Sequence, residues 1–208
     1  MPRTPAPFRR RVTGQTWTAL RALLILTVVL GLGYPLVVLG LGQLLLPAQA
    51  NGSLVRVDDE IVGSSLLGQS FADADGDPLP EWFQPRPSAA GDGYDGAASS
   101  GSNYGPENAD LIAAIEERRA AIAEFNGVDP QDVPADALTA SASGLDPHIS
   151  PAYARLQVAR VAEARGLDEA DVRDLVEQHI QGRDLGYLGD PTVNVLELNV
   201  ALAALGAD

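Results

Sequence analysis

An unbroken apolar run dominates the hydropathy pattern of the chain. No charged residue occurs between Ala22 and Val55, and residues 22–46 are almost wholly aliphatic. About 20 consecutive apolar residues are enough for a helix to cross the hydrocarbon core of a membrane. The run therefore predicts one transmembrane helix, which we place over residues 19–47. A buried core helix is the alternative, but runs of this length are typical of membrane spans.

A cleaved signal peptide is another alternative for this segment, because Ala48-Gln49-Ala50 has the small residues of a cleavage site. The apolar part of a signal peptide covers only about 7–15 residues, far fewer than the run contains. We therefore expect the segment to be retained as a membrane anchor.

Four residues of the predicted span are candidates for contact with partner helices. Gly33 and Gly40 are seven residues apart and share a helix face, where the absence of side chains permits close packing. Pro35 should kink the helix, because proline removes a backbone donor and clashes with the preceding turn. Gln43 adds a polar group near the C-terminal end of the span.

The pattern after the span changes from strand-like to irregular. Residues 53–57 and 60–69 are typical of two short strands separated by Asp58-Asp59. Residues 72–106 are rich in Gly, Ser, Pro, Asn and Asp and lack periodicity, which predicts a long irregular loop. A loop of that length within a compact domain is usually functional or disordered.

Four helices with clear start signals follow the loop. Each begins after a side chain that can accept hydrogen bonds from the first free N–H groups of a helix. The predicted helices cover residues 109–126, 151–165, 169–182 and 195 onward, capped by Asn108, Ser150, Asp168 and Asn194. The predicted fold is a single N-terminal transmembrane helix followed by one helix-rich α/β or α+β domain.

Composition narrows the chemistry that the chain can perform. The 208 residues include 14 Arg, no Lys and 28 acidic residues, which gives a formal net charge of −14 at pH 7. This balance argues against a nucleic-acid partner, because phosphate binding needs clustered cations. The absence of Cys excludes disulfides, Cys-ligated zinc and thiol nucleophiles.

The charges are distributed unevenly about the apolar run. Residues 1–21 contain five Arg and no acidic residue, whereas the chain from Arg56 onward has a net charge of −19. Positive residues flank the cytoplasmic end of a membrane span. We therefore expect residues 1–18 to be cytoplasmic and residues 48–208 to form an extracytoplasmic acidic domain, anchored in the cell membrane by a single pass.

Three motifs with possible chemistry fail a closer test. The acids that follow Phe71 lack the Gly and Glu that a calcium loop needs at its sixth and twelfth positions. Residues 99–106 lack the Lys of a phosphate-binding loop. The Ser, Asp and His of residues 143–150 are close in sequence, but no nucleophile-elbow motif accompanies them. We predict no catalytic residue and no metal site.

Several short strings occur along the chain in an order and spacing that are specific when taken together. They are Tyr34-Pro35-Leu36, Gly42-Gln43, Pro47 and residues 49–54, 63–71, 83–89, 99–103, 139–146, 149–151 and 193–199. In this arrangement the sequence resembles the C subunit of the Kdp potassium-transporting ATPase, a bacterial P-type pump. The resemblance covers nearly the whole chain beyond its first 20 residues.

The resemblance implies a non-catalytic accessory subunit of a potassium uptake complex. Its expected partners are a channel-like K⁺-translocating subunit, a P-type ATPase subunit, a small one-span subunit and membrane lipid. ATP and K⁺ would act at the level of the complex, and no cofactor is expected on this chain alone. Within the matching strings, we expect Ser102, Asn103 and Asp146 to contact partner subunits.

The resemblance also implies that the chain raises the ATP affinity of the ATPase subunit, as a catalytic chaperone. Gln157 is the residue to which it assigns nucleotide contact. The charge asymmetry, however, places the domain on the side of the membrane opposite cytoplasmic ATP. An effect on ATP affinity would then be transmitted through the span and the partner subunits, as a coupling free energy of about 1–3 kcal/mol.

Two other functions are compatible with the residue pattern. One is a membrane-anchored or secreted extracytoplasmic binding protein unrelated to a pump, which cleavage after Ala50 would favour. The other is an extracytoplasmic serine hydrolase, whose nucleophile would be Ser141, Ser143 or Ser150. The resemblance favours the pump subunit over both.

Overall fold

The computed structural model describes the backbone of residues 8–206 and the side chains of residues 14–206. The chain divides into two compact units, with the boundary between Ser53 and Leu54. The limits predicted from the sequence, 1–18, 19–47 and 48–208, refer to a membrane and stay predictions, and residues 1–7 lie outside the described part.

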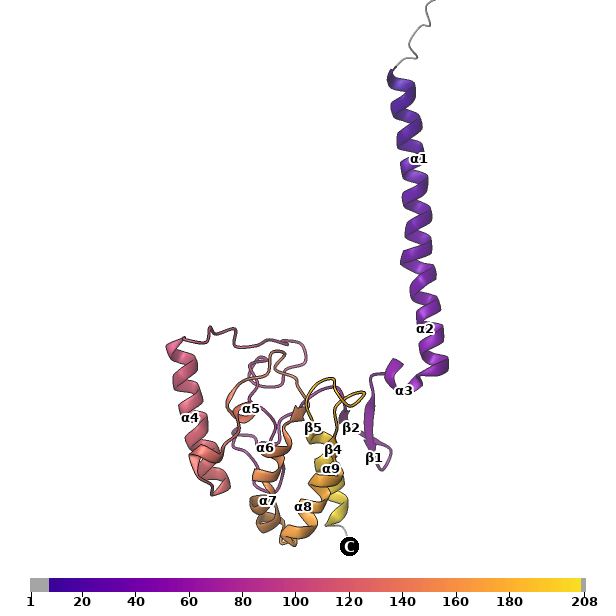
Figure 1. Ribbon diagram of the computed structural model, residues 1–208. Helices are drawn as coiled ribbons and strands as arrows, with labels where there is room; N and C mark the ends of the chain where they lie inside the picture. Colours follow the sequence, from indigo (N-terminus) through magenta and orange to yellow (C-terminus); the bar gives the residue numbers. More distant parts are fainter. Residues whose placement is uncertain (1–7, 207–208) are drawn as a thin grey trace, which may run out of the picture. The chain divides into compact units, whose positions relative to one another are not determined.

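The first unit is almost entirely helical (Figure 1). Helix α1 (Phe8–Val28), a π-helical turn η1 (Val29–Gly33) and α2 (Tyr34–Leu45) follow one another directly, and the short helix α3 (Pro47–Ala50) comes next. Residues 14–45 are long and apolar enough to cross a membrane, and no side chain of their most apolar stretch is buried within the chain. The prediction of one N-terminal apolar helix is confirmed.

The π turn ends two residues before Pro35. The N–H of Tyr34 donates to the carbonyl of Val29, five residues earlier, so the helix is wider here by one residue. A proline cannot donate to the carbonyl four residues before it, and its ring would clash with that carbonyl in a regular α-helix. The wider turn removes both difficulties, which explains why the helix continues through this point.

The domain begins with an antiparallel β-hairpin. Strand β1 (Leu54–Val57) pairs with β2 (Glu60–Ser64), with Leu54 opposite Ser64 and a register shift between Val55 and Arg56. Asp58 and Asp59 form the turn with φ angles of 49° and 67°, the left-handed conformation that a tight hairpin requires. The prediction that the second strand extends to residue 69 was wrong, because β2 ends at Ser64.

Helical segments, including the short 3-10 turn η2 and the four-residue helix α5, supply most of the remaining regular structure. They are α4 (Ala109–Asn126), η2 (Pro130–Asp132), α5 (Ala135–Leu138), α6 (Pro151–Leu156), α7 (Val158–Arg165), α8 (Glu169–Gln178) and α9 (Val195–Leu205). The four predicted N-caps each accept a hydrogen bond from a backbone N–H of the first turn: Asn108, Ser150, Asp168 and Asn194. In Figure 1, α4 lies at the edge of the domain, apart from the packed helices α7, α8 and α9.

Two of the predicted helix limits were wrong. The helix expected over residues 151–165 is divided at Gln157, where φ is −84° and ψ is −12° and the N–H donates to Ala154, only three residues earlier. The helix expected to reach Gly182 ends at Gln178, because Ile180–Gln181 leaves it to form a strand.

A second, three-stranded sheet was not predicted. Its strands β3 (His148–Ile149), β4 (Ile180–Gln181) and β5 (Thr192–Asn194) are antiparallel, with β5 in the centre. The core packs around this sheet and includes Val158, Val161, Val172, Val176, Val193, Leu198 and Leu202. The domain is therefore helix-rich with two small sheets, as the predicted α+β class requires.

Candidate functional site

The predicted contact residues of the apolar helix differ in their surroundings. Gly33, Pro35 and Gly40 are exposed, and a Cβ added at Gly40 would meet nothing within 4 Å. Gln43 instead has a partner within the same unit. Its Nε2 donates to Oδ1 of Asn51 at 3.2 Å and its Oε1 accepts from Nδ2 of Asn51 at 3.0 Å, which fixes the turn between α2 and α3.

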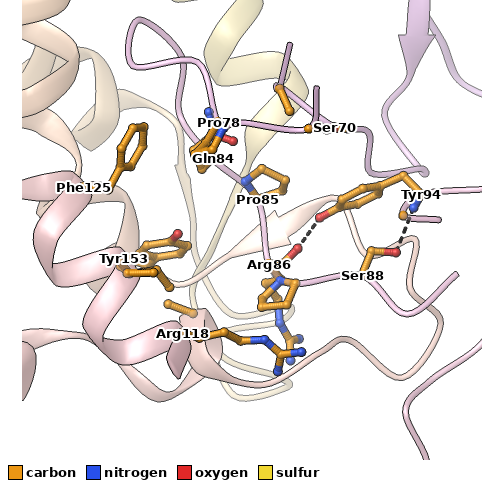
Figure 2. Close-up of a pocket in the computed structure, with 17 residues that line it drawn as sticks. Ser70, Pro78, Gln84, Pro85, Arg86, Ser88, Tyr94, Arg118, Phe125 and Tyr153 are labelled. Carbon is orange, nitrogen blue, oxygen red and sulfur yellow. Dashed lines mark hydrogen bonds between the residues drawn. The ribbon is translucent and has the colours of Figure 1, made fainter. Parts of the chain in front are cut away.

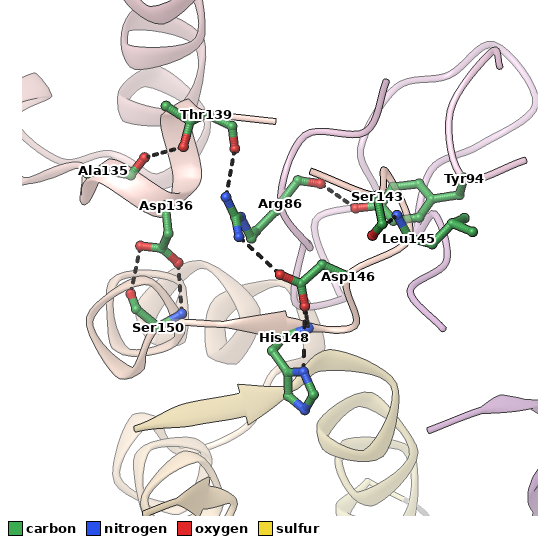
Figure 3. Close-up of polar contacts among 10 residues, drawn as sticks. All are labelled: Arg86, Tyr94, Ala135, Asp136, Thr139, Ser143, Leu145, Asp146, His148 and Ser150. Atoms are coloured by element: carbon green, nitrogen blue, oxygen red, sulfur yellow. Dashed lines mark hydrogen bonds and ion pairs between the residues drawn. The ribbon is translucent and has the colours of Figure 1, made fainter. Parts of the chain in front are cut away.

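A polar cluster of the domain surrounds Asp146 (Figure 3). Its Oδ2 accepts from Nη1 of Arg86 at 3.0 Å, and its Oδ1 accepts from the backbone N–H of His148 at 3.0 Å. The His148 ring Nδ1 lies 3.5 Å from Oδ1. Burial alone would raise the pKa of Asp146, but the hydrogen bonds from His148 and the charge of Arg86 outweigh it and hold the pKa below its usual value.

The local sequence explains how this cluster forms. Asp146-Pro147-His148 makes a turn in which an Asp side chain bonds the backbone two residues later, a conformation that this residue type favours. The same turn leads into β3, so the carboxylate is held by the sheet. Arg86 reaches it from the irregular segment and also donates to the Thr139 carbonyl at 3.3 Å.

The serines near this cluster are engaged in structural hydrogen bonds. The Ser150 hydroxyl donates to Oδ1 of Asp136 at 2.8 Å and accepts from the N–H of Tyr153 at 3.1 Å (Figure 3). The Ser143 hydroxyl accepts from the N–H of Leu145 at 3.1 Å. Within residues 14–206, no hydrogen bond joins His148 to a serine. The geometry is that of a capped helix and a turn, not of a Ser-His-Asp triad.

The predicted partner-contact residues Ser102 and Asn103 lie at the end of a loop that docks on residues 141–145. The Ser99 hydroxyl and the Ser100 N–H both donate to the Ser143 carbonyl, at 2.9 and 3.0 Å. Ser102 and Asn103 themselves are exposed, and Asn103 has a φ of 55°. The loop is fixed at its base, so these two side chains are presented to the surroundings from a defined position.

Gln157, the predicted nucleotide contact, lies inside the domain with 0% of its surface exposed. Its Oε1 accepts from the N–H of Gln84 and from Nη2 of Arg160, both at 2.7 Å, and its Nε2 donates to the Gln84 carbonyl at 3.1 Å. The amide therefore holds the irregular segment against the junction of α6 and α7. Nucleotide contact by Gln157 stays a prediction.

Arg160 extends this buried network and was not singled out from the sequence. It donates to Oδ1 of Asn126 at 2.9 Å and to the carbonyls of Pro80 and Trp82, and its guanidinium lies 4.5 Å from the centre of the Phe125 ring. Burial lowers its pKa to about 10, against the opposing effect of nearby Tyr153. The one sequence signal for its burial is its place in a predicted helix between the apolar residues Val158 and Val161.

The network, the Asp146 cluster and the docked loop together show a domain held together by side chains that bind backbone groups. Among the residues that the structure describes, no group of three or more His, Cys, Asp or Glu side chains is arranged to hold a metal ion. The sequence did not indicate a role for Arg86, Asp136 or Arg160. Each of them bonds to a group that lies 14–80 residues away along the chain.

Comparison with known proteins assigns the chain to a family. The family profile described as KdpC, the c chain of K⁺-transporting ATPase, matches residues 16–204. A protein named potassium-transporting ATPase KdpC subunit from Kineococcus radiotolerans is 60% identical over 188 residues, covering 90% of this chain and 92% of that protein.

Two further relatives of the same name show similar agreement. The protein from Beijerinckia indica is 51% identical over 88% of this chain and 90% of its own length. The protein from Mycobacterium bovis is 50% identical over 92% of this chain and 98% of its own length. The alternative of a binding protein unrelated to a pump has no support in these matches. The chain belongs to the KdpC family of potassium-transporting ATPase subunits.

Proposed function

We propose that the chain is a non-catalytic, single-pass accessory subunit that assembles with and stabilises the other subunits of a K⁺-transporting P-type ATPase. The match to the KdpC family over residues 16–204 carries this proposal. Its partners are the K⁺-translocating subunit, the ATP-hydrolysing subunit and a small one-span subunit. The exposed residues Gly33, Pro35 and Gly40 are the proposed helix contacts in the membrane.

Assembly can be tested with a tagged chain extracted from its native membrane in mild detergent. Mass spectrometry should identify a P-type ATPase and a multi-span K⁺ subunit in a stable ratio. Gly40→Leu places a large side chain on the proposed contact face and should reduce this recovery, whereas Leu39→Ile on a neighbouring face should not. Recovery of the chain alone, with its apolar helix intact, would contradict the proposal.

The proposed orientation places the N-terminus in the cytoplasm and the acidic domain outside. Its support is the contrast between five Arg before the span and a net charge of −19 from Arg56 onward. The chain has no Cys, so single cysteines are specific labels. An impermeant maleimide should label Glu107→Cys on intact cells and Thr4→Cys only after permeabilisation. The reverse pattern would show the opposite orientation.

The proposed role as a catalytic chaperone is an indirect one, transmitted through the membrane helix and the partner subunits. The engagement of both amide atoms of Gln157 inside the domain supports this route over direct nucleotide contact. Complexes that lack the chain should need more ATP for half-maximal hydrolysis, by about 5- to 150-fold. A photoreactive ATP analogue should label the ATPase subunit and not this chain. Labelling of the chain at Gln157 would favour direct contact instead.

The acidity of the domain supports a second role within the same complex. A net charge of −19 attracts cations, and we propose that the domain raises the K⁺ concentration at the entrance of the translocating subunit. Raising the ionic strength with choline chloride should increase the K⁺ concentration for half-maximal transport. An unchanged value would show that the acidity serves only solubility.

A further inference from the structure

A cavity of about 470 Å³ opens in the domain between α4, α6 and the irregular segment that contains Pro85 and Arg86. Figure 2 shows Phe125 and Tyr153 on one side of it, Tyr94 and Ser88 on the other, and Pro85 between them. Cavities of about 300–1,000 Å³ are typical of small-molecule sites. Much of the wall is apolar and comes from Pro85, Pro87, Ala121, Ile122, Phe125 and Ala137.

Two arginines of the wall meet at one point of the backbone. Arg86 donates to the Thr139 carbonyl at 3.3 Å and Arg118 donates to the Leu138 carbonyl at 3.0 Å. The two guanidinium groups therefore donate to consecutive carbonyl groups of the backbone. Asp146 neutralises Arg86, whereas Arg118 makes no ion pair within residues 14–206. The wall therefore carries one uncompensated positive charge within a strongly acidic domain.

Two hydrogen-bond donors of the wall have no acceptor in the described part of the chain. Nε of Arg86 is buried and unpartnered. Tyr153 is only 3% exposed and lines the cavity, and no hydrogen bond among residues 14–206 involves its hydroxyl. Burial raises the pKa of Tyr153 to about 12, so the hydroxyl keeps its proton at neutral pH. The Tyr153 hydroxyl keeps surface open to the cavity and can donate to an acceptor there, whereas Nε of Arg86 is closed off from it.

We propose that this cavity binds a small monocarboxylate with an apolar body. The carboxylate would accept hydrogen bonds from Arg118 and from the Tyr153 hydroxyl, and the body would contact Phe125 and Pro85. One carboxylate balances the single uncompensated charge of the wall, and guanidinium groups match carboxylate geometry. A multiply charged phosphate would leave surplus negative charge in an acidic domain, so the same argument selects against nucleotides.

The binding can be measured on the full chain in a neutral detergent, with 4-fluorophenylacetate as the probe and ¹⁹F NMR as the readout. The wild type should show saturable binding. Arg118→Gln should weaken it by about tenfold or more, because a hydrogen bond to a charged group is lost. Arg119→Gln is the matched control on the same helix, since Arg119 lies outside the cavity and donates to the Pro130 carbonyl. It should change the affinity by less than about twofold.

A second variant keeps the test valid if Arg118→Gln disturbs folding, which thermal melting followed by circular dichroism would reveal. Tyr153→Phe removes only the hydroxyl and should weaken binding by about two- to tenfold. The neutral analogue 2-(4-fluorophenyl)ethanol should not bind measurably. Absence of saturable binding to the wild type, equal effects of Arg118→Gln and Arg119→Gln, or stronger displacement of the probe by ATP than by phenylacetate would each overturn the proposal.

Discussion

Replacing Gln157 tests whether the buried amide holds the domain together. Gln157→Leu is nearly isosteric but removes all three hydrogen bonds of the side chain: two with Gln84 and one with Arg160. Two backbone groups and one guanidinium N–H then lack partners. At about 1–3 kcal/mol for each orphaned group, and with Gln84 only half-buried, the free energy of unfolding should fall by about 3–6 kcal/mol.

Urea unfolding of the full chain in mild detergent measures this loss. The chain has two tryptophans, and Trp17→Phe leaves Trp82 as the single fluorescent reporter within the domain. Trp82 adjoins the network, because its carbonyl accepts from Arg160 at 3.1 Å. With a urea slope of about 2 kcal/mol per M, the unfolding midpoint should fall by about 1.5–3 M.

Two comparison variants make the result specific. Gln178→Leu changes an exposed helical glutamine and should alter stability by less than about 0.5 kcal/mol. Gln157→Glu keeps the two accepted hydrogen bonds and adds a charge partner for Arg160, so it should cost less than Gln157→Leu. A loss below about 1 kcal/mol for Gln157→Leu, with an unchanged urea slope, would refute the structural role assigned to this residue.

Three further predictions follow from the loops and the Asp146 cluster. Gly144→Ala should destabilise the domain by more than about 2 kcal/mol, since φ is +68° and the new Cβ would lie 2.7 Å from the Ala90 nitrogen. The control Gly127→Ala has a similar φ of +64° but open space around the new Cβ, so in the same urea assay it should cost only about 1 kcal/mol. Because the folded-state pKa of Asp146 lies below 3.8, its carboxylate stabilises the domain above that pH, and the contribution is lost as the pH falls through the folded-state value. The stability difference between the wild type and Asp146→Asn should therefore be constant above about pH 5 and shrink as the pH falls below 3.8, and a constant difference over the lower range would contradict it. Ultraviolet titration should show one tyrosine ionising near pH 12, absent in Tyr153→Phe, and no difference between the two proteins would count against its burial.

The sequence was sufficient for features that depend on neighbouring residues. The caps at Asn108 and Asp168 were predicted because an N-cap bonds the backbone within two or three residues. The two-residue strands β3 and β4 were missed, because so short a segment carries no periodicity. The division of the helix at Gln157 was also missed; the side chain at this position bonds to Gln84, 73 residues away.

In the candidate site, too, local features could be predicted from the sequence and long-range contacts could not. Asp146 was selected through the string that contains it, and its turn with His148 is local. Its ion pair with Arg86 joins residues 60 positions apart, and no periodic or motif signal in the sequence predicts such a pair. The cavity is more distributed still, because its wall combines side chains from α4, α6 and an irregular segment.

The pairing of Phe83 with Asn199 has a consequence for the synthesis of the chain. Both backbone groups of Phe83 bond to the Asn199 amide, and the two residues are 116 positions apart. At about 5–20 residues per second, the ribosome adds Asn199 on the order of ten seconds after Phe83. This contact therefore forms only when the last helix has been made. Until then the backbone groups of Phe83 lack the side chain that satisfies them in the folded domain.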